Sequence, residues 1–311
     1  MQKPQIPEKA RKKLLQAGRI AAQALNYTCK RVESNSLLLE IVEAGERYIR
    51  ELDGQPAFPI NISVNHHAAH YTPGFDDSRR IPEKALVKID LGVHIDGYIA
   101  DTARTVIIGG DARIEKLKKA AEAGLQAAIA TARAGLRVWD VSKAISEAMR
   151  RMGSRPIENL TGHSIKRFTL HAGISVPSVA HISERVMSPR LQEHMVIAIE
   201  PFATYSRNPS VVGLERGGIF GFAQVRNPNH PKLRQLFSHM KMNYAQLPFA
   251  SRWLSEFVKP AEIDTTLSAL EKEGCIHNYP VLGLTDKKFI AQAEHTLIVE
   301  KDGCTVTTKV K

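Results

Sequence analysis

The stretch KIDLGVHIDGYIADTA, residues 88–103, constrains the fold more than any other part of this chain. Apolar runs flank Asp96-Gly97, a dipeptide typical of a two-residue hairpin turn because both residues accept a positive φ. If these residues form the turn, Gly92 pairs with Asp101 across the two strands. Asp90 lies two residues from Gly92 and therefore shares its face. The pattern predicts an antiparallel hairpin in which Asp90 and Asp101 are diagonal neighbours.

Two aspartates placed so close together in an apolar hairpin need a compensating charge. Carboxylates flanked by Ile and Leu lose hydration and repel each other, so a proton, a cation or a metal ion must lie between them. Gly92 has no side chain opposite Asp101, and we expect it to leave room for an ion. Asp96 has a separate, structural role, because Asp is favoured in tight turns.

Three further polar residues stand alone within apolar sequence. Glu200 ends VIAIE, Glu294 lies in AQAEHTLIV, and His163 follows a glycine in TGHS. Carboxylates with one imidazole suit Mn, Fe, Co or Zn rather than a thiolate site. Taken singly, a buried Glu could pair with an Arg instead, and a loop His could simply be hydrogen-bonded. Together with the hairpin aspartates, these residues predict a metal centre.

The order of the predicted elements indicates an α/β chain with mostly antiparallel strands. The chain has 311 residues, of which 43% are hydrophobic and 24% charged, as in an ordinary globular protein. Helical periodicity predicts helices over residues 7–32, 36–52, 112–134 and 138–152. Strand-like runs lie between and after them, among them HMVIAIEPFAT and a final hairpin in FIAQAEHTLIVEKDGCTVTTK.

A helical block interrupts the strands of the second half. Residues 228–276 carry three helical segments, and strand-like sequence resumes only after them. We therefore expect an inserted helical subdomain at residues 228–276, and a main catalytic domain formed by residues 1–227 and 277–311.

The formal net charge of +11 is unevenly distributed. Residues 1–31 hold eight Lys or Arg against Glu8 alone, and residues 226–260 hold six against Glu256. Such segments gain affinity for a polyanion by releasing counterions from phosphates. The alternative is a solvated helix face with no partner.

The chain lacks the sequence signals of export, of a disulfide framework and of a zinc ribbon. No apolar stretch has the length of a membrane span, and the basic start has no apolar region behind it, so we expect a cytoplasmic protein. Cys29, Cys275 and Cys304 lie far apart without a CxxC spacing, which argues against a disulfide framework or a zinc ribbon.

Several motifs follow one another in a characteristic order: AFPINISVNHHAAHYTPG, VKIDLGVHIDGYIADTA, LTGHSIKRFTLHAG, VIAIEPFAT, LPFASRWL and AQAEHTLIVEKDG. In this order the chain resembles the type 2 methionine aminopeptidases, in their short archaeal form, of the pita-bread or creatinase-like metallopeptidases. The resemblance implies an α+β pita-bread fold with two α/β halves related by a pseudo-twofold axis. The helical insertion is typical of type 2.

The resemblance also implies a ligand set and a reaction. Two divalent ions, Co, Mn, Fe or Zn, would be held by Asp90, Asp101, His163, Glu200 and Glu294, with Asp101 and Glu294 bridging. A bridging hydroxide, formed because the ions lower the pKa of water, would attack the first peptide carbonyl. The implied function is removal of the initiator methionine from nascent proteins and peptides whose second residue is small.

Other residues match substrate-handling positions of that family. By this resemblance, His70 approaches the scissile amide nitrogen, His171 contacts the carbonyl oxygen, and Glu200 carries a proton to the leaving amine. The methionine side chain would be bound by Phe58, Leu170, Phe202 and Tyr279. Without the family, these four would be read as core residues.

Some positions depart from the family pattern, and two other functions stay open. His66 and His67 replace a Glu and an aliphatic residue before His70, His194 replaces a turn glycine, and Ala293 replaces an aromatic residue. One alternative is an X-Pro peptidase of the same fold. The other is a ribosome- or RNA-associated binding protein, which the basic segments favour. The lack of an exposed apolar seam favours a monomer.

Overall fold

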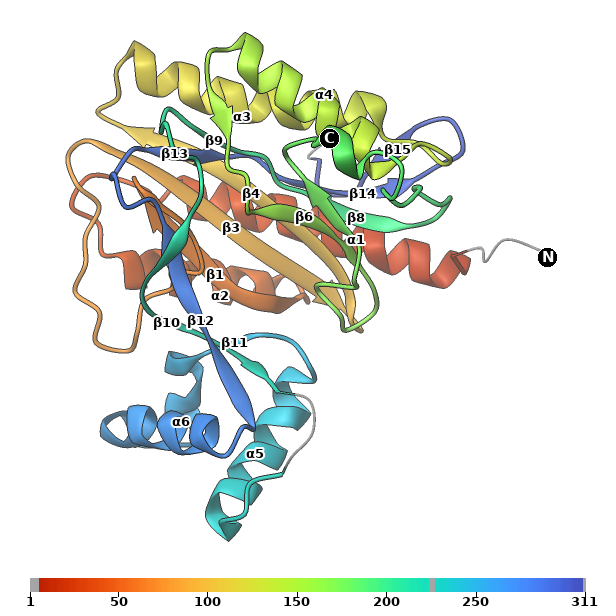
Figure 1. The fold of residues 1–311 in the computed structure, drawn as a ribbon. Helices are drawn as coiled ribbons and strands as arrows, with labels where there is room; N and C mark the ends of the chain where they lie inside the picture. Colours follow the sequence, from red (N-terminus) through yellow and green to blue (C-terminus); the bar gives the residue numbers. More distant parts are fainter. Residues whose placement is uncertain (1–5, 224–226, 310–311) are drawn as a thin grey trace.

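The first half of the molecule is a helix pair packed on an antiparallel sheet (Figure 1). The computed structural model describes residues 6–223 and 227–309. The first elements are α1 (Glu8–Cys29), α2 (Leu38–Glu51), β1 (Gln55–Val64), β2 (His67–Ala69), β3 (Ala85–Ile95) and β4 (Tyr98–Ile108). Strands β1, β3 and β4 form one sheet in that order. Apolar residues at helical spacing on α1 and α2 close the core against this sheet.

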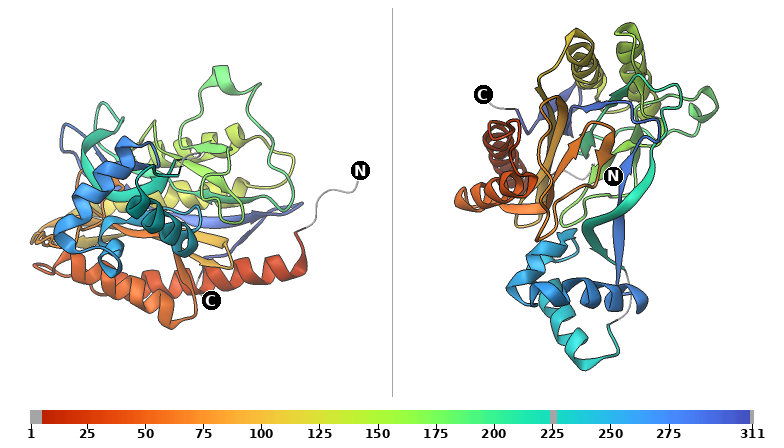
Figure 2. Two further views of the ribbon diagram at one scale, coloured as in Figure 1. Left: turned by 90° about the horizontal axis from the view of Figure 1, so that it is seen from below. Right: turned by 90° about the vertical axis from the view of Figure 1, so that its left-hand side faces the viewer.

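The second half repeats this plan with different strands. Its elements are α3 (Ala112–Thr131), α4 (Val138–Arg151), β5 (Arg155–Pro156), β6 (Thr161–Ile165), β7 (Ser175–Pro177), a 3₁₀ turn (Ile182–Glu184), β8 (Val196–Ile199), β9 (Phe202–Thr204), β13 (Ile290–Gln292), β14 (His295–Val299) and β15 (Cys304–Val306). The sheets run β15-β14-β8-β6-β7 and β13-β9-β5. A second core joins α3 and α4 to these strands, and the two helix pairs lie on different outer sides (Figure 2).

The predicted hairpin is confirmed, with its register. Strands β3 and β4 pair antiparallel so that Gly92 faces Asp101. Asp96 and Gly97 form the turn with φ of 50° and 83°, the left-handed values that this turn requires. Asp90 therefore lies on the same face as Asp101, two pairs further along the ladder.

The expectation of one continuous strand at HMVIAIEPFAT is wrong. Strand β8 ends at Ile199, and β9 begins at Phe202 in a different sheet. Pro201 lies between them, and a proline has no N–H to continue a ladder. Glu200 therefore lies at a break between two sheets, where its side chain can turn into the interior rather than alternate along a strand.

The predicted helical block lies at one end of the molecule, where two long strands, β10 (Val212–Phe222) and β12 (Ile276–Gly283), connect it to the rest of the chain. It contains α5 (Pro231–Tyr244), β11 (Phe249–Ala250), two 3₁₀ segments (Ser251–Glu256 and Pro260–Glu262) and α6 (Ile263–Lys272). Its apolar residues form a separate cluster that includes Phe237, Phe249 and Leu267. The division into domains at residues 228 and 276 stays a prediction.

Two expectations concern features outside the site. Within the described residues, no helix combines the length and the apolar character that crossing a lipid bilayer requires. Cys29, Cys275 and Cys304 are free thiols.

Candidate metal centre and substrate cavity

The backbone N–H and carbonyl groups of Asp101 on β4 are both hydrogen-bonded to a residue of the C-terminal strands. The Asp101 N–H donates to Thr296 Oγ1 at 2.7 Å, and the Thr296 hydroxyl donates to the Asp101 carbonyl at 2.9 Å. The Glu294 N–H donates to the Ala103 carbonyl at 3.1 Å, and the Thr102 hydroxyl donates to the Glu294 carbonyl at 2.9 Å. These bonds join the two halves of the molecule at the two predicted bridging carboxylates.

The other predicted ligands converge on this junction. His163 Nε2 lies 3.7 Å from Asp101 Oδ2 and 3.7 Å from Glu200 Oε1. One ligand atom each of Asp101, His163 and Glu294 lie within 4.8 Å of one another. Gln292 Nε2 donates to Asp90 Oδ2 at 3.2 Å and to Glu294 Oε2 at 3.4 Å. All five predicted ligands therefore face one cavity, and their roles as ligands stay a prediction.

Burial and mutual repulsion make this cluster unfavourable without a cation. Loss of hydration raises the pKa of Asp90 to about 7. Burial, reinforced by neighbouring carboxylates, raises the pKa of Asp101, Glu200 and Glu294 well above the usual range. In the described part of the chain, none of the cluster's carboxylates forms a salt bridge with Lys or Arg. The alternative that a buried Glu simply pairs with an Arg therefore does not apply to Glu200 or Glu294.

The donor set fits divalent metal ions. Asp90 Oδ1 and Asp101 Oδ1 are buried and have no hydrogen-bond partner among the described residues. Burial lowers the pKa of His163 to about 3, so its imidazole is neutral and its Nε2 can coordinate. Clustered carboxylate oxygens with one neutral imidazole are ligands that Mn, Fe, Co and Zn accept.

The space beside Gly92 holds a ring, so our expectation that it leaves room for an ion is wrong. A Cβ on Gly92 would lie 2.4 Å from Phe58 Cε1 and 3.0 Å from the Ala57 Cβ. Phe58 is the partner of Gly92 across β1 and β3, and its ring occupies the position of the missing side chain. The glycine therefore brings an aromatic side chain up to the face that carries Asp101.

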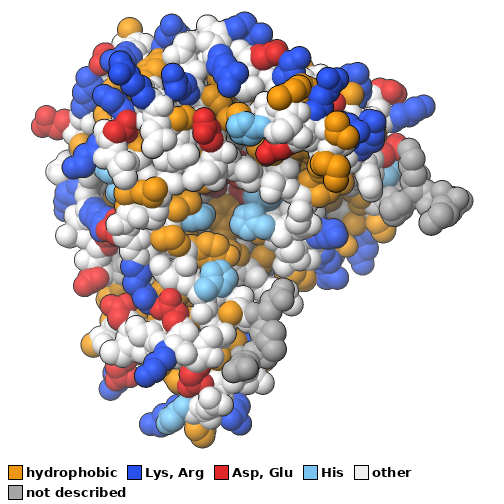
Figure 3. All heavy atoms as spheres, viewed as in Figure 1, with side chains coloured by type: hydrophobic (Ala, Val, Ile, Leu, Met, Phe, Trp, Pro, Cys, Tyr) orange, Lys and Arg blue, Asp and Glu red, His pale blue; other side chains and the backbone are white. Residues whose placement is uncertain are grey.

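The carboxylates lie in a cavity of about 240 Å³ with an apolar side. Phe58, Leu170 and Tyr279 line it together with the five predicted ligands, His70 and His171. Figure 3 shows a hollow on this face with histidine side chains around it. Phe202 does not line the cavity. It is 1% exposed and packs in a neighbouring core with Ile157 and Leu284, because β9 belongs to a different sheet.

Two histidines face the cavity as neutral imidazoles. His70 has a φ of 65°, and burial lowers its pKa to about 4. Its Nδ1 is buried without a hydrogen-bond partner in the described residues, and its ring packs edge-on against Tyr279 at 5.4 Å between centroids. His171 lies at the exposed rim, edge-on to His163 at 4.3 Å, and loss of hydration lowers its pKa.

Several cavity residues were not identified from the sequence. Asn61, Ile219 and Pro248 line the cavity, and Asn159, Leu160 and Thr161 do so at the start of β6. Pro248 belongs to the motif LPFASRWL, and Asn61 to AFPINISVN, so both motifs marked the right segments. The pairing of β1 with β3 brings Asn61 to the ligands, and the pairing of β10 with β11 brings Pro248 there.

The positions that depart from the family pattern lie around the cavity rather than in it. His66 and His67 pack against each other with centroids 4.5 Å apart, and neither lines the cavity. His194 has a φ of 69°, a left-handed value that normally favours glycine. Ala293 is buried and forms a bridge with Arg104 of β4, beside Glu294.

Comparison with known proteins gives the same family. A family model described as metallopeptidase family M24 matches residues 12–225. A methionine aminopeptidase of Thermococcus kodakarensis is 43% identical over 298 residues, covering 96% of this chain and 99% of that protein. The chain belongs to metallopeptidase family M24. The expected resemblance to short archaeal methionine aminopeptidases is confirmed, and with it the classification as a metallo-aminopeptidase.

Solved structures of this fold confirm the predicted α+β pita-bread architecture. A structure described as a thermophilic Arx1 has a TM-score of 0.85 at 16% identity, covering 97% of this chain and 91% of that one. The methionine aminopeptidase from Thermotoga maritima has a TM-score of 0.71 at 21% identity and covers both chains completely. At these identities the likeness concerns the fold alone. Membership in this metallopeptidase family implies that the chain binds divalent metal ions.

Proposed function

We propose that this M24 metallopeptidase removes the N-terminal methionine from nascent proteins and peptides whose second residue is small. The observation that supports the proposal is the cavity, which is lined by four carboxylates and an imidazole together with the apolar side chains of Phe58, Leu170 and Tyr279. An unbranched thioether side chain fills an apolar slot of this kind well. The curated relatives of the same length carry the name methionine aminopeptidase.

The proposed centre holds two divalent ions. Asp101 and Glu294 would bridge them, Asp90 would complete one ion, and His163 and Glu200 the other. When bound, such a pair would lower the pKa of water at the site and so supply a hydroxide nucleophile near neutral pH. The position of Asp101 supports a bridging role, because its carboxyl group interacts electrostatically with those of Asp90, Glu200 and Glu294.

The remaining polar residues would bind the peptide and move protons. His70 and His171 are neutral imidazoles, each with one N–H. The Pro280 carbonyl accepts the ring N–H of His70, so its free Nδ1 can accept a hydrogen bond from the substrate, whereas His171 can donate one. We assign His70 to the scissile amide nitrogen and His171 to the carbonyl oxygen that gains charge. Glu200 has a raised pKa, which suits a carboxyl group that takes a proton and passes it to the leaving amine.

Turnover of short peptides tests this function. With Mn²⁺ or Co²⁺ added, the protein should release methionine from Met-Gly-Met and much less from Met-Leu-Met. Cleavage of an X-Pro dipeptide without cleavage of Met-Gly-Met would favour the proline-directed alternative. Anomalous scattering from crystals grown with Mn²⁺ should show two ions between Asp101 and Glu294, and a single ion would contradict the dinuclear centre.

We further propose that the protein acts as a cytoplasmic monomer that contacts the ribosome. Lys3 and Arg226, two of the basic residues behind this expectation, lie outside the described residues. Arg252 is buried and is not available to a polyanion. The exposed basic residues that support the proposal are Lys9, Lys12, Arg19, Lys30, Lys232, Arg234, Lys241 and Lys259.

Sedimentation with ribosomes at several salt concentrations tests this contact. Binding through phosphate groups should weaken steeply as salt rises. A failure to bind even at low salt would remove the ribosome proposal and leave the peptidase proposal untouched. Size-exclusion chromatography with light scattering measures the oligomeric state.

A further inference from the structure

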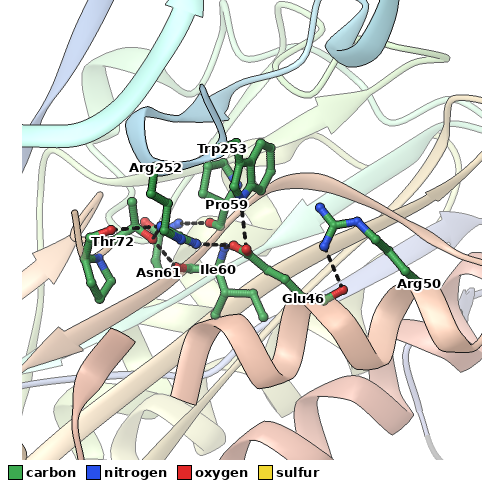
Figure 4. Close-up of polar contacts among 9 residues, drawn as sticks. Glu46, Arg50, Pro59, Ile60, Asn61, Thr72, Arg252 and Trp253 are labelled. Carbon is green, nitrogen blue, oxygen red and sulfur yellow. Dashed lines mark hydrogen bonds and ion pairs between the residues drawn. The ribbon is translucent and has the colours of Figure 1, made fainter. Parts of the chain in front are cut away.

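A buried ion pair connects the helical block to the first half of the molecule. Glu46 on α2 and Arg252 in the 3₁₀ segment after β11 are 3% and 4% exposed, and the Arg252 guanidinium contacts the Glu46 carboxylate (Figure 4). The indole N–H of Trp253 donates to the other Glu46 oxygen at 2.8 Å. One carboxylate of the first half therefore binds two consecutive side chains of the helical block.

Arg252 also holds the segment that follows His70. Its Nη1 donates to Thr72 Oγ1 at 2.8 Å and to the Pro73 carbonyl at 3.0 Å. The Thr72 hydroxyl in turn donates to the Ile60 carbonyl on β1 at 2.8 Å. Arg252 thus fixes the distance between β1 and the backbone two residues beyond His70.

Glu46 reaches the other side of His70 through β1. The Ile60 N–H donates to Glu46 Oε1 at 3.1 Å. The next residue, Asn61, accepts the N–H of His70 on its Oδ1 at 2.7 Å, and its Nδ2 donates to the Pro59 carbonyl at 2.8 Å. The left-handed backbone of His70 is therefore held by an amide that is one residue from the Glu46 contact.

Strand β10 also packs on the backbone of the segment from His70 to Thr72. A Cβ on Gly218 would lie 2.7 Å from the Thr72 carbonyl, and one on Gly217 would lie 2.1 Å from the Tyr279 carbonyl and 3.3 Å from that of His70. The glycine-rich stretch of β10 therefore packs directly on the segment from His70 to Thr72. The Ile62 N–H of β1 also donates to the Tyr71 carbonyl at 2.8 Å, so the ion pair acts on a segment that is already anchored at its middle.

We propose that Glu46 and Arg252 are positioning residues for the cavity, which hold the His70 imidazole at the distance from the metal centre that the reaction needs. The inference rests on the proposed function, because it assigns His70 to the peptide. Neither residue lines the cavity, so both act through Ile60, Asn61 and Thr72. The helical block, through Arg252, is thereby part of the machinery that orients His70.

The directed hydrogen bonds of this ion pair explain its presence better than a gain in stability does. Burying two charges costs hydration, and apolar side chains of similar volume at such positions are often equally stabilising. Arg252 Nε also lacks a partner within the described residues, which adds to that cost. What an apolar pair cannot supply is the set of directed bonds to Ile60, Thr72 and Pro73.

Kinetics of metal-loaded variants test the proposal. Arg252→Met removes the bonds to Glu46, Thr72 and Pro73, and we expect kcat on Met-Gly-Met to fall about tenfold or more, since small misplacements of reacting groups are costly. KM and the affinity for Mn²⁺ should stay within about twofold, because the residues that bind methionine and metal are unchanged. Arg252→Lys keeps the ion pair but cannot make all the bonds, and its kcat should fall less.

The matched control is Phe237→Leu. Phe237 is fully buried in the core of the helical block and contacts neither the ion pair nor the cavity. This variant should lower the melting temperature and leave kcat unchanged. If Arg252→Met does not fold, Arg252→Lys and Glu46→Gln take its place. An unchanged kcat in every folded variant, or an equal fall in Phe237→Leu, would overturn the proposal.

A second measurement separates this inference from the proposed function. In ¹⁵N-histidine-labelled protein, the His70 ring signal is identified as the one missing from His70→Gln. That signal should shift in Arg252→Met or Arg252→Lys and stay in place in Phe237→Leu. If the unmodified protein does not cleave methionyl peptides, the proposed function fails. The NMR result then decides alone whether Arg252 positions His70, and an unmoved signal contradicts it.

Discussion

The cavity has a floor and a wall that are built in different ways. The floor consists of the five predicted ligands, which lie on or next to paired strands: Asp90, Asp101, His163, Glu200 and Glu294. The wall consists of His70, which follows β2, and of Ile219, Pro248 and Tyr279, which lie in the helical block or on the strands that flank it. Backbone ladders fix most of the floor and also Ile219 and Tyr279 of the wall, which pair with each other, whereas side-chain bonds at Arg252 and Asn61 hold the segment that carries His70. Damage to the floor should remove the metal, and damage to the wall should change the rate while the metal stays.

The largest effect is expected for Asp101→Asn. An amide cannot bridge two cations, so Mn²⁺ binding should be lost and kcat should fall to below about one-thousandth of its value. Isothermal titration calorimetry and peptide turnover measure the two effects.

Asp96→Asn is the matched control, because Asp96 lies on the same hairpin and contacts Lys13 at the surface. Asn is also favoured in this turn, so metal binding and turnover should be unchanged. Full activity in Asp101→Asn, or a comparable loss in Asp96→Asn, would contradict the proposed floor.

The next largest effect is expected for His70→Gln, a change in the wall. Loss of a group that handles a proton or the scissile amide typically costs about a hundredfold in kcat. Mn²⁺ affinity should be unchanged, since His70 is not one of the proposed ligands.

His67→Gln is the control, because His67 lies three residues before His70 at the start of β2, is half-buried and does not line the cavity. Its kcat should be close to that of the unmodified protein. A loss of metal in His70→Gln would place His70 in the floor and break the distinction between the two regions.

The sequence predicted the floor better than the wall, for a physical reason. A two-residue turn determines the register of the whole hairpin, so Asp90 and Asp101 could be placed on one face by counting. The strands that bring Glu200 and Glu294 to this face are distant in sequence, and only the family resemblance joined them to it. Pro201, which ends β8, was not recognised as a break between two sheets.

The wall depends on contacts that periodicity does not contain. Arg252 was counted with the basic surface, but it is buried against Glu46, a partner 206 positions away. Phe202 was assigned to the methionine pocket, but its side chain packs in a core behind the cavity. Both errors arise because a side chain's surroundings depend on which distant strands lie next to it.

The acidic floor should make the metal-free protein sensitive to pH. The pKa values of Asp101, Glu200 and Glu294 are raised in the folded protein, so the folded state binds more protons than the unfolded one above about pH 4. Their contribution to stability is present below the unfolded pKa and is lost as the pH rises through the folded pKa. Burial lowers the pKa values of Lys88, His70, His163 and His171, and these groups act in the opposite direction.

Metal should reverse this trend, because it binds the deprotonated carboxylates. We expect Mn²⁺ to raise the melting temperature little near pH 5.5 and increasingly toward about pH 8. Differential scanning fluorimetry with and without Mn²⁺ gives the difference, in which the other titrating groups largely cancel. A metal-induced shift that does not grow with pH would mean that the carboxylates do not form the site. Glu294→Gln should flatten the dependence.

The smallest effect is expected where the floor meets the apolar slot, at Gly92→Ala. The new Cβ would lie 2.4 Å from the Phe58 ring, so the ring must move away from the face that carries Asp101. KM for Met-Gly-Met should rise severalfold while Mn²⁺ affinity stays the same, because Phe58 supplies apolar contact and no ligand. Gly303→Ala is the control, since no atom lies within 4 Å of its added Cβ. If Gly92→Ala instead weakens Mn²⁺ binding and leaves KM unchanged, the space beside Gly92 serves the metal centre, and Phe58 does not belong to the methionine slot.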